Sequence, residues 1–184
     1  EGFLRDVIGL MREGRLDEAR GRAESAASVT EYFAPISLPL AARAALWAGD
    51  APAAGALVSQ IERFVSRGQA ITLDHQTLGA GVAALAGRRA EAVAAYRDAL
   101  RGWHALGLAF DEAMATLDMT ILLAPTEAEM SEAAAAVMTA RETLTRLGAR
   151  PFIERLDAVP AGSTAKVPGL LPMTRVAGQV EIEA

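Results

Sequence analysis

The chain has 184 residues, a formal net charge of −5 and a hydrophobic content of 52%, with only 5% aromatic residues. It contains no cysteine, which excludes disulfides and thiolate chemistry. The acidic balance argues against a nucleic-acid partner, and no apolar run approaches the ~20 residues of a membrane-spanning helix. We therefore expect a cytoplasmic protein that contacts neither nucleic acid nor membrane.

Apolar residues at helical spacing predict helices along most of the chain. Thr30 is a candidate N-cap for a helix that includes Trp47. Pro35 and Pro39 leave two alternatives, a helix that begins after Pro39 or one with irregular first turns. The other expected helices cover 2–13, 16–27, 51–67, 73–86, 89–106, 109–123, a segment from Glu127 or Ser131 to Leu147, and 151–158.

The last 26 residues have a different composition. Residues 159–184 contain three prolines and three glycines and show no helical periodicity. Val180 and Ile182 alternate with polar residues, which is a weak strand pattern. The sequence predicts a helical domain over 1–158, followed by an extended tail or linker over 159–184. A linker to another domain and a docked segment both remain open.

A helix-turn-helix phrase recurs around Gly14, Gly49 and Gly87, with a degenerate copy around Pro125. The intervals are 35, 38 and 38 residues. A period of this size predicts an all-α superhelical solenoid of about nine helices in antiparallel pairs. Small residues recur five positions after each glycine, where paired helices must approach closely: Ala19, Ala54 and Ala92.

These offsets resemble those of the tetratricopeptide (TPR) repeat, so the chain looks like a divergent TPR-like domain. A narrower resemblance covers 78–158, which includes Tyr96–Leu100, Trp103–Gly107 and the phrase Arg146-Leu147-Gly148-Ala149-Arg150-Pro151. This stretch is similar to the C-terminal repeats of large bacterial regulators that join such repeats to an NTPase module. Some of those regulators carry an adenylate or guanylate cyclase domain, and others a LuxR-type helix-turn-helix. Nothing after Ala158 looks like the latter, which favours the cyclase-type relatives.

The resemblance implies a regulatory repeat domain of a larger signalling protein, with no catalysis in this segment. The expected partner is another protein or a domain of the same parent chain, and a small effector is also possible. The alternative is a stand-alone TPR-like adaptor that binds a peptide of a partner protein. A homodimer remains open, because alanine-rich end repeats lack polar capping faces.

The concave groove of the solenoid is the predicted binding site. Arg43, with carboxylates nearby, is a candidate to grip the charged end of a peptide or a small charged effector, and an ordinary solvated face is the alternative. The first helix of each repeat should line this groove. The expected contacts are Ile36, Arg43, Trp47, Asp74, Thr77, Glu112 and Met119.

No catalytic constellation is visible in the sequence. Asp74 and His75 are neighbours on a helix and point in different directions, so they do not form a site by themselves. Two histidines and no cysteine make a zinc site improbable. An enzyme hidden in a helical fold would need a convergent polar cluster. We therefore expect no catalytic, cofactor-binding or metal-binding residue, and we expect Trp103 to pack between repeats.

Overall fold

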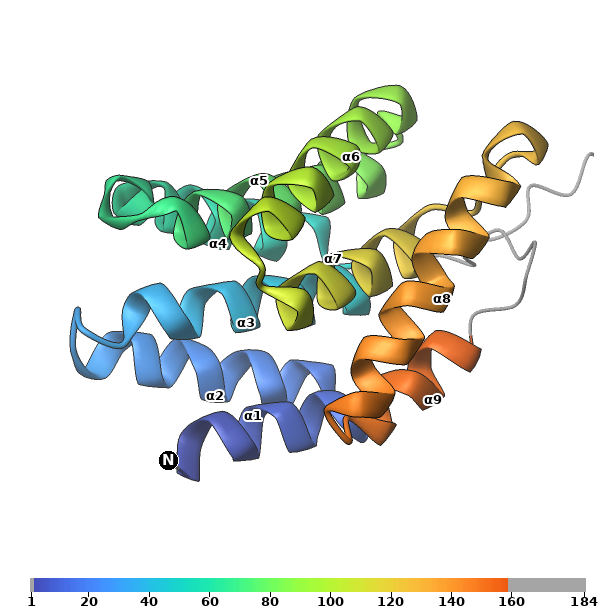
Figure 1. Ribbon diagram of the computed structural model, residues 1–184. Helices are drawn as coiled ribbons and strands as arrows, with labels where there is room; N and C mark the ends of the chain where they lie inside the picture. The colour runs from blue at the N-terminus through green and yellow to red at the C-terminus, as the bar shows by residue number, and fades with distance from the viewer. Residues whose placement is uncertain (1, 159–184) are drawn as a thin grey trace, which may run out of the picture.

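The computed structural model describes residues 2–158, and this part of the chain is helical with no strand. The all-α class and the number of nine α-helices are confirmed for these residues (Figure 1). The helices are α1 (Gly2–Arg12), α2 (Leu16–Val29), α3 (Ala34–Ala48), α4 (Ala51–Ile61), α5 (Gln69–Leu85), α6 (Arg89–Leu106), α7 (Ala109–Leu122), α8 (Met130–Arg146) and α9 (Arg150–Ala158). Two 3-10 helices, η1 (Glu62–Arg67) and η2 (Glu127–Glu129), follow α4 and precede α8. The predicted tail and its strand pattern lie outside the described residues.

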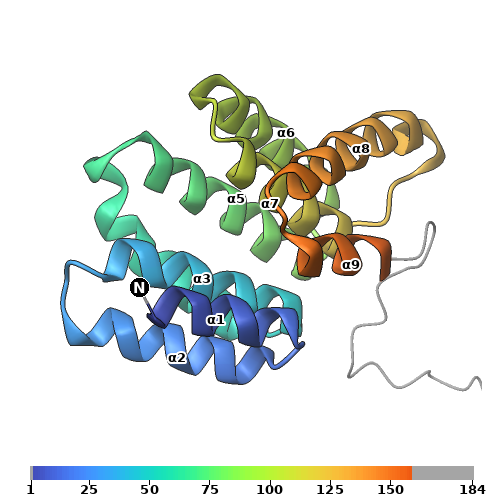
Figure 2. The ribbon, with the colours of Figure 1, turned by 60° about the horizontal axis from the view of Figure 1, so that its bottom comes forward.

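Helices that follow each other in the chain pack together, from α1 against α2 to α8 against α9. Helices two apart also touch along one series, α3 with α5, α5 with α7 and α7 with α9. Two further contacts bring distant parts together, α3 with α7 and α1 with α9. The last helix therefore returns to the first, as Figure 2 shows for α9 beside the layer of α1, α2 and α3.

The recurring glycine phrase corresponds to a recurring turn. At the end of α3, Gly49 has φ 76°, a left-handed conformation that costs glycine little. Its N–H donates to Leu46 O and the N–H of Asp50 to Ala45 O, both at 3.0 Å, which closes the helix. Asp50 then caps α4 by accepting from the Ala53 N–H at 3.0 Å. The same pair of backbone bonds closes the helices that end at Gly14, Gly87, Gly107 and Gly148.

The start of α3 differs from the prediction that Thr30 caps it. The helix begins at Ala34, four residues later, and the Thr30 hydroxyl instead accepts from the Tyr32 N–H at 2.9 Å within the preceding turn. Pro35 lies in the first turn, where a backbone N–H has no helical partner to lose. The helix continues through Pro39, so the alternative in which it begins after Pro39 is wrong.

Two other helix boundaries move by several residues, while α8 begins at Met130, next to the predicted Ser131. The helix expected over 51–67 is α-helical only to Ile61 and continues as the 3-10 helix η1. The next helix begins at Gln69 instead of Leu73, directly after Gly68. Before α8, Thr126 and Glu129 form a capping box in which the Thr126 N–H and hydroxyl both donate to the Glu129 carboxylate, at 2.9 and 2.8 Å.

The core is rich in alanine, which lets helices approach closely. Nearly every residue of α3 from Ser37 to Trp47 is buried, so α3 is the central helix. A Cβ added at Gly81 of α5 would lie only 2.6 Å from Leu46 Cδ1, so the glycine allows the close α3–α5 contact. Among the described helices, none has the length and apolar character needed to cross a membrane.

Candidate functional site

Arg43 and Trp47, two of the expected groove contacts, belong to a buried network between α3 and α7. Arg43 is only 7% exposed, and its Nε lies 2.8 and 3.1 Å from the two carboxylate oxygens of Asp118. The indole N–H of Trp47 donates to Asp118 at 2.8 Å. Asp118 is fully buried and has therefore lost its hydration. The three hydrogen bonds from α3 compensate for this loss. This network joins helices that are more than 70 residues apart in the chain.

Carboxyl groups from two helices surround the Arg43 guanidinium. Burial disfavours its charge, but the charges of Asp118 and Asp74 outweigh burial and raise the pKa of Arg43. Burial raises the pKa of Asp74 to about 6, and the negative charges of Asp111 and Asp118 add to this, while Arg43 acts against it. Arg43 is therefore paired inside the protein, and it is not exposed to the end of a bound peptide.

Helix α9 covers this network. The Arg155 guanidinium lies 4.4 Å from the centre of the Trp47 ring, a cation–π contact. The Phe152 ring meets Trp47 edge to face, with 6.3 Å between the ring centres. Arg155 also donates to the Met11 carbonyl at 3.3 Å, which links α9 to the end of α1. With α9 in place, Trp47 is not available to a ligand.

The other predicted groove residues lie in different environments. Ile36 is exposed near the start of α3, while Thr77 is buried and accepts from the Trp103 indole at 3.0 Å. Trp103 is buried, and it packs in a cluster with Leu73 of α5 and Ala115 of α7. Glu112 is partly buried and lies 3.4 Å from His104, and Met119 lines a cavity described next. The structure thus brings Arg43, Trp47 and Asp74 together but gives the seven residues no common accessible surface.

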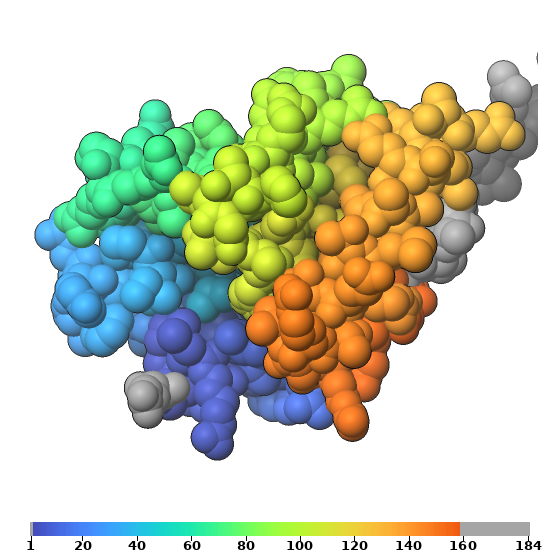
Figure 3. All heavy atoms as spheres, viewed as in Figure 1, coloured from blue at the N-terminus to red at the C-terminus, as the bar shows by residue number. Residues whose placement is uncertain are grey.

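A cavity of about 300 Å³ lies between α6, α7 and α8. Figure 3 shows the recess between α6 and α8, which make little direct contact with each other. Alanine side chains of α8 are too short to reach α6, and this leaves the space open. Its wall includes the apolar residues Val93, Leu100, Met119, Leu123, Met130, Ala133, Ala134, Ala136, Val137 and Leu156.

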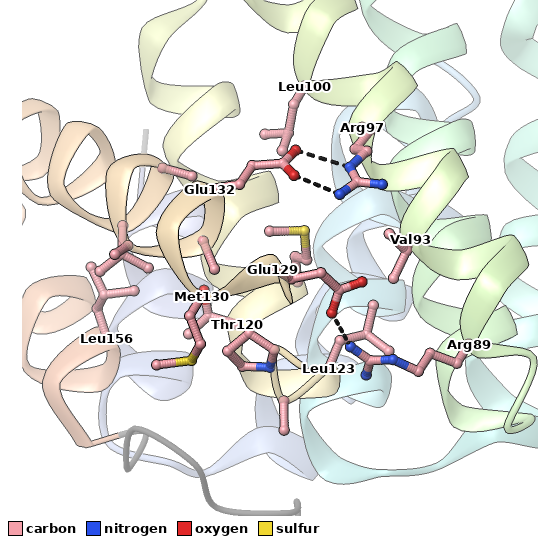
Figure 4. A pocket seen from close by; sticks show the side chains of 17 residues that line it. Arg89, Val93, Arg97, Leu100, Thr120, Leu123, Glu129, Met130, Glu132 and Leu156 are labelled. Atoms are coloured by element: carbon pink, nitrogen blue, oxygen red, sulfur yellow. Dashed lines mark hydrogen bonds and ion pairs between the residues drawn. The ribbon is translucent and has the colours of Figure 1, made fainter. Parts of the chain in front are cut away.

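Two ion pairs at this cavity join α6 to the following segment, one to η2 and one to α8 (Figure 4). Arg97 donates to the two carboxylate oxygens of Glu132 at 2.9 and 2.5 Å, and Arg89 donates to Glu129 at 2.5 Å. Hydrogen bonds from the Thr126 backbone and hydroxyl, together with Arg89, lower the pKa of Glu129 to about 2. The cavity therefore combines an apolar interior with charged groups at its edge, as ligand sites commonly do.

Sequence reasoning found only Met119 of this cavity. Two signals were present, and the first is the run of four alanines over 133–136 in α8. Arg89 and Arg97 are also spaced by two helical turns, which puts them on similar faces of α6. Neither signal says that α6 and α8 stand side by side, because that depends on contacts between separate helix pairs.

The arrangement is suited to binding. The buried carboxyl groups face Arg43 and are not aimed into the cavity, and within residues 2–158 no three metal-ligating side chains gather at one place. Among the described residues that line the cavity, Thr120 is the one with a hydroxyl group, and it donates to the Thr116 carbonyl at 2.7 Å. Comparison of the chain with protein-family models, with curated proteins and with solved structures finds no match.

Proposed function

We propose that this chain is a regulatory binding domain of a larger cytoplasmic signalling protein and has no catalytic activity of its own. The observation that carries the proposal is the apolar cavity between α6, α7 and α8, with its two ion pairs. Its volume of about 300 Å³ lies at the lower end of the range for small-molecule sites. A small effector or a side-chain cluster of a partner protein suits a site of this size.

The finer architecture that we propose is a TPR-like superhelix of antiparallel helix pairs. Sequential packing and the series of contacts between α3, α5, α7 and α9 support it. So do the five identical glycine turns, because each closes one helix before the next begins. In such a fold each pair touches mainly its neighbours, so a ligand between two pairs can change their relative orientation.

Helix α8 is the element that binding is expected to move. None of its residues from Met130 to Thr139 is fully buried, whereas Ala140, Thr143 and Leu144 anchor its second half. A ligand in the cavity favours whichever position of α8 it contacts best. Because α8 packs on α9, and α9 on Trp47, this shift can reach the centre of the domain. Such a shift would couple binding in the cavity to the activity of an attached module.

The experiment has two steps. Sequencing the gene upstream of Glu1 identifies the attached module, and an NTPase or cyclase domain there provides an activity to assay. In that full protein, Ala136→Met fills the cavity. This variant should change how far added cell extract raises or lowers the measured activity. Ala135→Met is the matched control, because Ala135 is exposed and lies outside the cavity wall. A nearby start codon with no such module, or equal responses of both variants, contradicts the proposal.

A specific surface favours the adaptor alternative. Four large apolar residues around the α2–α3 turn are exposed, with Tyr32 at 77% and Val29 at 73%. The other two are Phe33, directly before α3, and Ile36, in its first turn. Exposed apolar groups of this kind often mark protein contacts. An adaptor would lose partner binding in Tyr32→Ser and keep it in Ala136→Met, whereas the cavity proposal predicts the reverse.

A further inference from the structure

We propose that the cavity between α6, α7 and α8 binds an amphipathic anion, a medium-chain carboxylate. Its alkyl chain lies among the apolar side chains, and its carboxylate takes the place of Glu132 on Arg97. This inference rests on the proposed function in using the same cavity, and it adds the chemical class of the ligand. Three features carry it: the apolar wall, the difference between the two ion pairs, and the position of Arg97 beside the wall.

The wall of the cavity suits a flexible alkyl chain. Aside from Thr120 and the ion-pair residues, it is formed by aliphatic residues, two methionines and the short alanines of α8. Among residues 2–158, none that lines it has an aromatic ring to stack a planar ligand. Covering an apolar wall of this kind with an alkyl chain removes apolar surface from water, which favours binding. Methionine side chains adapt to a guest of irregular shape.

The two ion pairs differ in how firmly each glutamate is held. Glu129 accepts from Arg89 and also from the backbone and hydroxyl of Thr126, which fixes it at the start of α8. Glu132 has Arg97 as its hydrogen-bond partner, and its side chain is 60% exposed. An exposed ion pair contributes little stability, so a ligand carboxylate can displace Glu132 at low cost.

Arg97 is well placed to hold the carboxylate of a ligand. Its Nε and Nη2 already bind both oxygens of one carboxylate, the planar two-point geometry that arginine offers to such groups. It lies on α6 between Val93 and Leu100, both of which line the cavity. A ligand held at Arg97 therefore has its chain next to the apolar wall. Glu132, once displaced, points from the exposed surface of α8 into water.

The first measurement is a calorimetric titration of the full 184-residue chain with decanoate. Decanoate should bind at one site. Octanoate, which is two methylenes shorter, should bind roughly 15-fold more weakly, since each buried methylene contributes about a fourfold change in affinity. Decanol, with the same chain and no charge, should bind roughly two- to fivefold more weakly than decanoate, because the exposed pair with Arg97 contributes modestly. Equal binding of decanoate and decanol overturns the inference and indicates a purely apolar guest, such as side chains of a partner protein.

Two variants of one ion pair separate a ligand contact from a structural role. Arg97→Gln and Glu132→Gln break the same bridge between α6 and α8. If the bridge only shapes the cavity, both variants change decanoate affinity in the same direction. If Arg97 holds the ligand and Glu132 competes with it, Arg97→Gln weakens binding roughly two- to fivefold and Glu132→Gln strengthens it by a similar factor. A change in the same direction overturns the inference.

The site itself is tested with the pair Ala136→Met and Ala135→Met. The first should abolish decanoate binding and the second should leave it unchanged. Urea unfolding of both variants checks that the chain remains folded. If both variants still bind decanoate, the ligand lies elsewhere and the inference is overturned. If decanoate does not bind but Ala136→Met alters the activity of the full protein, the carboxylate is rejected as the ligand. The proposed function then still stands.

Discussion

Replacement of Asp118 by leucine should strongly destabilise the fold. Asp118→Leu leaves the Arg43 guanidinium buried without its partner, which typically costs about 3–5 kcal/mol. The Trp47 N–H also loses its acceptor, at a further cost of about 1–3 kcal/mol. Arg43→Met leaves the Asp118 charge unpaired but keeps the bond from Trp47, so it should cost less than Asp118→Leu.

The double variant Arg43→Met/Asp118→Leu provides the decisive comparison. Neither charge remains, so its cost should be no greater than that of Asp118→Leu alone, a coupling of at least about 3 kcal/mol. Equilibrium unfolding in urea, followed by far-ultraviolet circular dichroism, gives the four free energies. If the cost of the double variant equals the sum of the two single costs, so that the coupling is below about 1 kcal/mol, the reasoning that this ion pair joins α3 to α7 is refuted.

Three further predictions concern stability. Asp74→Asn should raise the free energy of unfolding by about 2–3 kcal/mol at pH 7.5 but little at pH 4. The reason is that Asp74, with its pKa raised to about 6, favours the folded state while protonated, and this contribution is lost as the pH rises from about 4 through 6. Equal effects in urea titrations at the two pH values contradict this. Gly81→Ala should destabilise by about 1–3 kcal/mol because the new methyl group meets Leu46, whereas Gly79→Ala, with open space around it, should stabilise by about 0.5–1 kcal/mol; thermal melts that rank the two variants the other way refute it. Phe152→Ala should cost about 3–5 kcal/mol, because it removes the ring that packs on Trp47, and urea unfolding that shows a loss below 1 kcal/mol would mean that α9 is not docked as described.

Local signals in the sequence predicted the helices and most of their ends. The left-handed turn at Gly49 needs glycine, and the capping box before α8 needs Thr126 and Glu129 three residues apart, so both can be recognised from neighbouring residues. Thr30 shows the limit of this reasoning. It has the right chemistry for a cap, but the chain makes a further turn before α3 begins.

The environment of the candidate site could not be predicted in the same way. Arg43 was expected in an open groove because its helix lines the inner face of a TPR-like pair. Its partner Asp118 is 75 residues away, and the cover comes from Phe152 and Arg155 on the last helix. These contacts depend on how several helix pairs stack in space, and helical periodicity within one pair holds no information about that.

Hydrogen exchange of the full chain, with and without saturating decanoate, tests most directly whether the cavity between α6, α7 and α8 is the binding site. Binding there should slow exchange in α8 from Met130 to Val137 and in α6 from Arg89 to Leu100, because these segments line the cavity. Exchange in α1 and α2, which lie away from it, should not change. Bound decanoate that slows exchange only around α1 and α2, or equally in all helices, would contradict a binding site between α6 and α8.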